Sequence, residues 1–217
     1  MVSPKFYQDI EAAKRALGSL PCDWDGKQCV LALKEADYNW RQMEWIGFYF
    51  EHKCRSLLQP DFCIPGDRFG TVSFDAKRTF NWDFKSKAIK SDDHKAILND
   101  KSAMEASVER YGEHGGIIAL LDVEYNDSNR TFQTWHSQLK GGLSKYERER
   151  KERTAVSRYR KTRAILVEIL FLHFDASALP LLDTMNQGRN SNGAPRPPKY
   201  MIDLEKADKF LVDRLKF

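Results

Sequence analysis

Residues 68–89 read RFGTVSFDAKRTFNWDFKSKAI and carry the clearest strand pattern in the chain. Apolar side chains alternate with polar ones up to Asp75, and after a break near 78–80 the alternation resumes. The apolar positions are Val72, Phe74, Phe80, Trp82 and Phe84. A period of two is typical of strands that bury one face. The stretch therefore predicts two neighbouring antiparallel strands.

The pairing register follows from the same pattern, because neighbouring strands must place their apolar side chains on one face. Pairing Lys77 with Asn81 satisfies this condition and sets Asp75 directly opposite Asp83. Opposed carboxylates have Cβ atoms about 5 Å apart and repel each other unless a cation offsets their charge. Lys85 follows on the same polar face. Because Mg²⁺ prefers oxygen ligands and keeps several waters, this face is a candidate Mg²⁺ site open to a substrate phosphate.

A purely structural interpretation of this hairpin stays open. Exposed strand faces are often charged, and the Asp-x-Lys tripeptide of residues 83–85 also occurs at 75–77. The register, the ligand type and the gathering of charge on one face together favour a functional role for Asp83 and Lys85 over a solvated hairpin.

An acidic residue, a short interval and then Asp-x-Lys on the next strand resembles the PD-(D/E)xK nuclease superfamily. The segment FDAKRTFNWDFKSKA, preceded by QMEWIGFYFE in a predicted helix, resembles the type II restriction endonucleases within it. The resemblance is best over residues 40–90. It implies a restriction endonuclease-like core and Mg²⁺-dependent hydrolysis of double-stranded DNA that leaves 5′-phosphate ends.

The resemblance also implies roles for individual residues. In that superfamily two acidic positions bind Mg²⁺, and the lysine orients or activates the attacking water. Carried over, Asp75 and Asp83 are the metal ligands and Lys85 is the catalytic lysine. Asp67, in PGDRFG, is the alternative to Asp75. No Pro-Asp dipeptide stands at either place, which departs from the family pattern.

The family often adds a glutamate from the helix before the hairpin. Glu44 and Glu51 are seven residues apart and would share one helix face. Glu44 is the preferred catalytic candidate because QMEW is the more family-like context, and Glu51 is the alternative. Both can equally be solvated helix charges.

The remaining segments predict a mixed central sheet flanked by helices, in a single α/β domain spanning residues 1–217. The spacing of apolar residues distinguishes helices from strands, and capping and helix-breaking residues mark where the helices end. Helices are expected from Ser3-Pro4 to near Gly18, over 36–58, over 144–163 and over 204–215; buried strands over 116–125 and 164–174; and a polar loop over 186–198.

Basic residues gather in the second half of the 144–163 segment, where five cations and no acidic residue lie between 153 and 163. The Gly141-Gly142 pair before it would let backbone approach DNA closely, and the polar loop carries side chains able to read base edges. The candidate DNA contacts are Arg153, Ser157, Arg160, Lys161, Lys140 and Arg189. An exposed, charge-solubilised helix and a disordered connector are the alternatives.

The composition is that of an ordinary soluble globular chain: 217 residues, 41% hydrophobic and 30% charged, with a net charge of +4. No apolar run approaches the roughly 20 residues of a membrane span. The charged amino terminus lacks an export signal, so we expect a cytoplasmic protein whose four cysteines are reduced.

The absence of other motifs narrows the function classes. The chain has no P-loop, GxSxG or HExxH segment, and its five histidines form no metal-binding spacing, so no nucleotide cofactor is expected. We expect a type II site-specific deoxyribonuclease that acts as a homodimer on palindromic duplex DNA. The alternatives are a repair or recombination nuclease of the same superfamily, and a non-catalytic nucleic-acid-binding protein.

Overall fold

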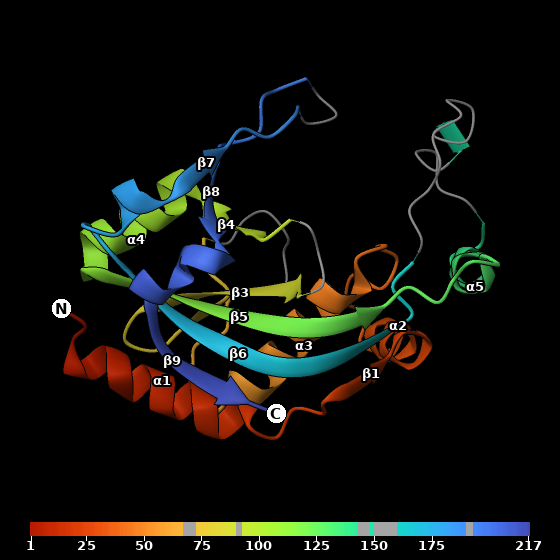
Figure 1. The fold of residues 1–217 in the computed structure, drawn as a ribbon, viewed down its shortest axis with the longest axis horizontal. Coiled ribbons are helices and arrows are strands. Elements are labelled where there is room, and N and C mark those ends of the chain that lie inside the picture. The colour runs from red at the N-terminus through yellow and green to blue at the C-terminus, as the bar shows by residue number, and fades with distance from the viewer. Residues whose placement is uncertain (67–72, 90–92, 143–147, 150–159, 190–192) are drawn as a thin grey trace.

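The computed structural model describes residues 1–66, 73–89, 93–142, 148–149, 160–189 and 193–217. Its centre is a curled mixed sheet with the strand order β2-β3-β5-β6, in which β1 and β9 both pair with β6 (Figure 1). These strands are β1 (Asp23–Asp25), β2 (Ala76–Lys77), β3 (Asn81–Ala88), β5 (Glu113–Glu124), β6 (Arg163–Asp175) and β9 (Leu211–Lys216). β3 and β5 are parallel, and the other pairs of this sheet are antiparallel.

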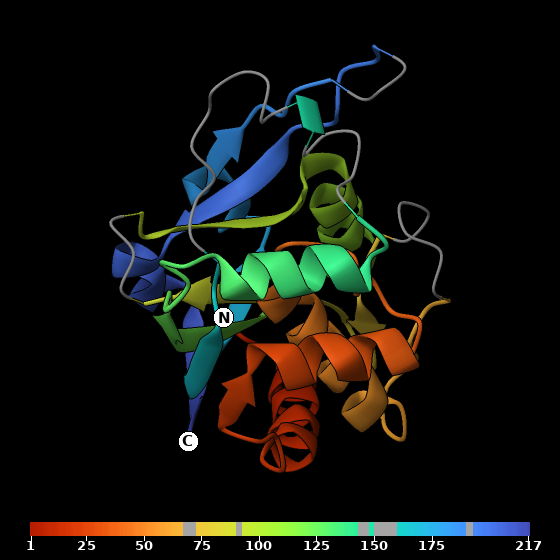
Figure 2. The same ribbon diagram turned by 90° about the vertical axis from the view of Figure 1, so that its right-hand side faces the viewer.

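A second, smaller sheet has the antiparallel order β4-β8-β7. It lies with helix α4 above the main sheet, whereas helices α1, α2 and α3 lie below it (Figure 2). The upper layer contains β4 (Lys95–Asp100), α4 (Lys101–Tyr111), β7 (Asp183–Met185), β8 (Lys199–Asp203) and two 3₁₀ helices, η1 (Leu179–Leu181) and η2 (Leu204–Lys209). The other helices are α1 (Pro4–Leu17), α2 (Gly26–Glu35), α3 (Trp45–Leu58) and α5 (Thr131–Leu139). The sheet is thus covered on both faces.

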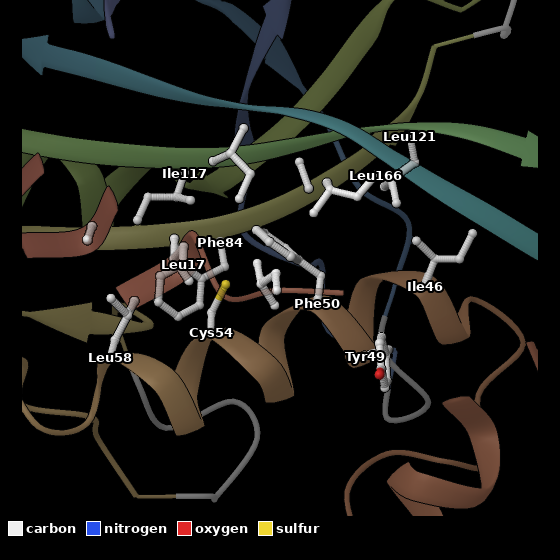
Figure 3. Close-up of a cluster of buried hydrophobic side chains, with 14 of the residues drawn as sticks. Leu17, Ile46, Tyr49, Phe50, Cys54, Leu58, Phe84, Ile117, Leu121 and Leu166 are labelled. Carbon is white, nitrogen blue, oxygen red and sulfur yellow. The ribbon is translucent and has the colours of Figure 1, made fainter. Parts of the chain in front are cut away.

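One apolar cluster fills each of the two faces of the main sheet. Alternate residues of β3 face these two clusters. Trp82 and Phe84 point into the larger cluster, where α1 and α3 pack against the sheet (Figure 3). The alternate residues Asn81, Asp83 and Lys85 face the other way, as the period of two predicts. The polar face of β3 therefore meets the layer that contains α4 and β4, where the second apolar cluster lies.

The two long central strands confirm the predictions for 116–125 and 164–174. β5 and β6 pair along almost their whole length, and most of their side chains are buried. A glycine is required where β5 passes β3, because a Cβ on Gly115 would lie 2.2 Å from the ring of Trp82. The first helix is also as predicted: Ser3 caps α1 by accepting a hydrogen bond from the amide of Phe6, and the helix ends at Leu17.

The helix predicted over 36–58 is wrong in its first part. α3 begins only at Trp45, and the residues before it form turns. Asp37 and Asn39 have φ angles of 50° and 43°, which a right-handed helix cannot contain. Propensity alone did not reveal this break, because neither residue is a glycine or a proline.

The closing helix predicted over 204–215 is also wrong. The segment forms η2 and then β9, which pairs antiparallel with β6. Pairing with a long neighbouring strand outweighed a weak helical pattern. Of the helix predicted over 144–163, residues 148–149 are helical, residues 160–162 are irregular and Arg163 begins β6. Arg153 and Ser157 lie outside the described residues.

The coarse fold prediction is confirmed: the chain is a mixed α/β fold with helices on both sides of a mixed sheet. Within the described residues, we find no helix of the length and apolarity that crossing a bilayer requires.

Candidate active site

The hairpin register is the one that the alternation predicts. Lys77 pairs with Asn81, and Ala76 pairs with Trp82. β2 contains only these two residues, so the ladder ends there, although the amide of Asp75 still donates to the carbonyl of Trp82 over 2.9 Å. Beyond this point, no strand in the described part of the chain pairs with the outer edge of β3.

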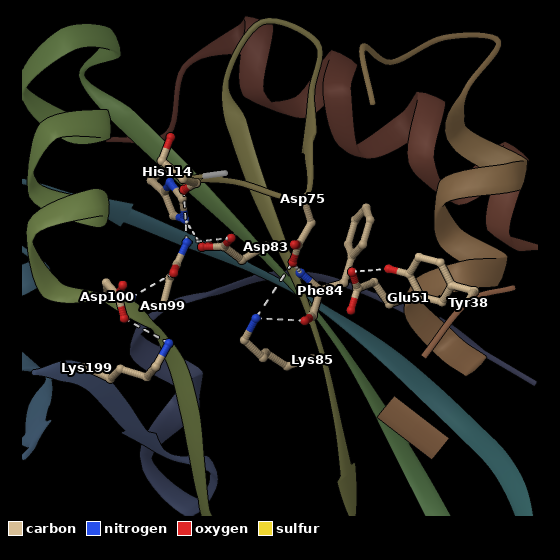
Figure 4. A network of polar contacts seen from close by, with 11 residues as sticks. Tyr38, Glu51, Asp75, Asp83, Phe84, Lys85, Asn99, Asp100, His114 and Lys199 are labelled. Atoms are coloured by element: carbon tan, nitrogen blue, oxygen red, sulfur yellow. Dashed lines mark hydrogen bonds and ion pairs between the residues drawn. The ribbon is translucent and has the colours of Figure 1, made fainter. Parts of the chain in front are cut away.

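The side chain of Asp75 takes the place of the missing strand. Its Oδ2 accepts a hydrogen bond of 2.6 Å from the amide of Phe84. The Nζ of Lys85 donates to the carbonyl of Phe84 over 2.9 Å and lies 3.7 Å from the same carboxylate oxygen (Figure 4). The structure therefore brings Asp75 and Lys85 together beside the outer edge of β3.

The turn between β2 and β3 is fixed from α1 by a carboxylate that is fully buried, Asp9. Its Oδ2 accepts hydrogen bonds from two backbone amides of the turn and from the indole of Trp82, and its Oδ1 accepts one from Arg78. The amides are those of Thr79 and Phe80. This anchor holds the hairpin, and with it the register of the two candidate acids.

Asp83 lies on the polar face of β3 and is almost completely buried. Its Oδ1 accepts a hydrogen bond of 2.8 Å from the amide nitrogen of Asn99, at the end of β4. Its Oδ2 lies 2.9 Å from Nε2 of His114, near the start of β5. Both partners come from outside the hairpin, and both are close to Asp83 in Figure 4.

The glutamate that α3 brings to this group is Glu51, the alternative to Glu44. Glu51 accepts a hydrogen bond from the hydroxyl of Tyr38, and its charge acts on both Asp75 and Lys85. Glu44 precedes the first residue of α3, is largely exposed and pairs with the ammonium of Lys161 at 2.6 Å. The late start of α3 thus separates two glutamates that a continuous helix would have placed on one face.

The electrostatics of the group centre on Asp75. The pKa of Asp75 is raised to about 6, with burial as the largest cause. The charge of Lys85 opposes this rise, but the charges of Asp83 and Glu51 add to it. The charges of three carboxylates thus act on Lys85, and a bound divalent cation would relieve the repulsion between Asp75 and its acidic neighbours.

The other two groups are held in their charged forms. Burial acts to raise the pKa of Asp83, but the hydrogen bond from His114, the charge of Lys85 and the hydrogen bond from Asn99 lower it below its usual value. Burial acts to lower the pKa of Lys85, but the charges of Asp75 and Asp83 raise it above its usual value. An ammonium that keeps its proton can position a water or a phosphate oxygen, and it is a poor general base.

The donor set fits Mg²⁺ by its chemistry. Asp75 and Asp83 supply hard carboxylate oxygens, and Mg²⁺ commonly takes only one or two protein carboxylates and fills the rest of its shell with water and phosphate. No three acidic, histidine or cysteine side chains of the described residues form a ready-made metal cage. The site suits a cation that substrate helps to coordinate.

The predicted DNA contacts that the structure describes are Arg160, Lys161, Lys140 and Arg189. Arg160 is buried, and the Nζ of Lys161 is occupied by Glu44. The backbone carbonyl of Lys140 accepts from the guanidinium of Arg41 at 2.7 Å, while Arg189 donates to the carbonyl of Gly193 within its own exposed loop. Asp67, the alternative first acid, lies outside the described residues, as do two further predicted contacts.

Sequence reasoning missed Asn99 and His114. Each comes from another strand and carries no motif of its own. The one available signal is that His114 is a polar residue at the head of a long apolar run, 114–121, which predicts that the chain buries a polar group there.

Comparisons with protein-family models, with curated proteins and with solved structures found no match for this chain.

Proposed function

We propose that this chain is a Mg²⁺-dependent endonuclease that hydrolyses phosphodiester bonds in double-stranded DNA, as a type II restriction endonuclease with a PD-(D/E)xK core. One observation carries the proposal. Lys85 lies 3.7 Å from Asp75 at the outer edge of β3, with Asp83 on the same strand and the charge of Glu51 added from α3. Acids with a protonated lysine at an open strand edge suit a metal and a phosphate.

The chemistry assigned to each residue follows from its position. A bound Mg²⁺ would polarise the scissile phosphate and stabilise charge on its oxygens. Asp75 and Asp83 would hold the cation, and the charge of Glu51 acts beside them. Lys85, fixed by the carbonyl of Phe84, orients the attacking water and offsets charge that develops on the phosphate.

The finer parts of the proposal rest on the sequence resemblance. It implies 5′-phosphate products and a defined recognition sequence. A homodimer on a palindromic site would place one active site at each strand, because a two-fold axis relates both the subunits and the two scissile bonds. The +4 net charge is compatible with a polyanionic substrate.

The test is digestion of plasmid and phage DNA with the purified protein in the presence of Mg²⁺. We expect discrete fragments from the wild type and none when EDTA replaces Mg²⁺. Lys85→Met, which retains the aliphatic stem, and Asp83→Asn should both lose cleavage. The matched control is Lys14→Met, which removes a lysine paired at 2.7 Å with Asp213 between α1 and β9.

The outcomes separate the candidate functions. Cleavage of any duplex without discrete fragments would favour a repair or recombination nuclease of the same superfamily. Salt-sensitive DNA binding without cutting would favour a non-catalytic nucleic-acid-binding protein. Full metal-dependent cleavage by Lys85→Met would refute the assignment of the site.

A further inference from the structure

The carboxylate of Asp83 is held by two side chains that the hairpin does not supply. Asn99 contacts one oxygen at 2.8 Å and His114 the other at 2.9 Å. An ionised carboxylate has about four lone-pair sites, so one acceptor site per oxygen remains for a cation or a water. The two contacts therefore fix the orientation of the carboxylate without using up its capacity to bind.

The protonation of His114 follows from a chain of buried hydrogen bonds. Nδ2 of Asn81 can only donate, and it lies 3.1 Å from Oγ of Ser107. That hydroxyl lies 3.0 Å from Nδ1 of His114. Because the carboxylate of Asp83 can only accept, the ring nitrogen that faces it at 2.9 Å, Nε2, carries a proton, and the hydroxyl of Ser107 can donate to Nδ1. That proton points at Asp83.

Asn99 ties the two halves of the site together. One amide hydrogen goes to Asp83, and the other goes to the carbonyl of Ser73, two residues before Asp75, over 3.0 Å. Its own Oδ1 accepts from the amide of Asp100 at 2.7 Å, so the orientation of the amide group is fixed. A single side chain thus couples the segment that carries Asp75 to the carboxylate of Asp83.

We propose that His114 and Asn99 are positioning residues, which act through Asp83 to preorganise the proposed divalent-cation site, with Ser107 holding His114 in the Nε2–H tautomer. The inference rests on the proposed function for the identity of the cation. Groups that orient metal ligands in this way typically change metal affinity by roughly 10–100-fold when they are removed. The protein would thereby build one half of its metal site from strands outside the motif.

A structural role alone would predict something different, namely a loss of stability with an unchanged metal affinity in the molecules that remain folded. The chain offers a matched control. His173, on β6, is also buried and is bound through Nε2 to Glu113 at 2.8 Å, but its ring packs against Phe6 on the opposite face of the sheet. His173→Ala removes a buried, carboxylate-bound histidine without touching Asp83.

The experiment measures Mn²⁺ binding by titration calorimetry, without DNA, on variants whose folding is checked by circular dichroism. His114→Ala and Asn99→Ala should bind Mn²⁺ at least about tenfold more weakly than the wild type. His114→Gln, whose amide can still donate to Asp83, should recover most of the affinity, and His173→Ala should bind as the wild type does. If His114→Ala does not fold, Asn99→Ala and His114→Gln decide the question.

A second readout is the tautomer itself. In ¹⁵N-detected spectra of the wild type, the proton of the His114 ring should reside on Nε2, and Ser107→Ala should increase the Nδ1–H form. A wild type with an Nδ1–H ring, or Asn99→Ala and His114→Ala variants with undiminished Mn²⁺ affinity, would overturn this inference while leaving the proposed nuclease intact. A wild type that binds no divalent cation would overturn both.

Discussion

The two ends of one hairpin hold two carboxylates in opposite circumstances. At the turn, Asp9 is fully buried, yet it accepts three N–H hydrogen bonds on one oxygen and pairs with Arg78 on the other. At the open end, Asp75 accepts one hydrogen bond from a backbone amide and lies 3.7 Å from the ammonium of Lys85. The charges of two further carboxylates act on it. The charge of Asp9 is met by four hydrogen-bond donors, whereas that of Asp75 is met by one amide and a more distant ammonium.

The contrast between Asp9 and Asp75 distinguishes a carboxylate that stabilises the fold from one suited to a functional site. A buried charge with a full set of donors anchors a structure, because removing it would leave those donors unsatisfied. A cluster of acids with a raised pKa is destabilising by itself, and such arrangements occur preferentially at functional sites. We therefore interpret the turn end as the anchor of the hairpin and the open end as the site that a cation completes.

The largest expected effect is on catalysis at the open end. Asp75→Asn should reduce Mg²⁺-dependent DNA cleavage by about 10³-fold, which is about 4 kcal/mol in activation free energy. The reason is that the amide keeps the hydrogen bond from Phe84 but loses the charge that holds the cation. Single-turnover cleavage of a defined duplex measures it. Asp9→Asn, assayed well below its melting temperature, should keep its activity within a few-fold.

The next effect is on stability at the turn end. Asp9→Asn should lower the free energy of unfolding by about 3 kcal/mol. The neutral amide cannot compensate the charge of Arg78, and its NH₂ group would face N–H groups that need an acceptor. Urea denaturation followed by circular dichroism provides the measurement. A loss below roughly 0.5 kcal/mol, within the range of ordinary surface substitutions, would remove the claim that this carboxylate anchors the hairpin.

A smaller effect of opposite sign is expected at the open end. The pKa of Asp75 is raised to about 6 in the fold, above its value of about 4 in the unfolded chain. The folded state therefore has its full stability below about pH 4 and loses part of it as the pH rises through about 6. Asp75→Asn should therefore be more stable than the wild type by about 1–2 kcal/mol at pH 8, and this gain should vanish near pH 4. Urea titrations in EDTA at the two pH values test the sign.

The smallest effect is the stabilisation by the cation. At a Mg²⁺ concentration about ten times the dissociation constant, the wild type should gain about 1.4 kcal/mol, or about 3–5 °C in melting temperature. Asp75→Asn should gain much less, because it lacks a ligand. Differential scanning calorimetry with matched ionic strength measures the shift, and an equal gain in both proteins would indicate that Mg²⁺ binds elsewhere.

Local patterns predicted the parts of the site that are close in sequence. The alternation in residues 68–89 was sufficient to pair Lys77 with Asn81, and hence to bring Asp75, Asp83 and Lys85 to one place. These residues lie within a single hairpin, so strand periodicity alone determines their relative positions. The two long buried strands were predictable because each is a nearly continuous apolar run in the sequence.

The parts that depend on distant segments could not be predicted. His114 and Asn99 reach Asp83 from β5 and β4, and their approach depends on the order of strands across the sheet. The choice between Glu44 and Glu51 depends on where α3 begins. The left-handed backbone at Asp37 and Asn39 prevents a continuous helix from starting earlier. Neither property leaves a periodic signal in the sequence.

The central claim is that a divalent cation binds between Asp75 and Asp83 at β3. The most direct test is a crystal structure of the protein soaked in Mn²⁺, with anomalous scattering used to locate the metal. We predict one strong peak bonded to carboxylate oxygens of both Asp75 and Asp83, at about 2.1–2.2 Å. A map without a peak there, or with the metal bound only at other residues, would contradict the account.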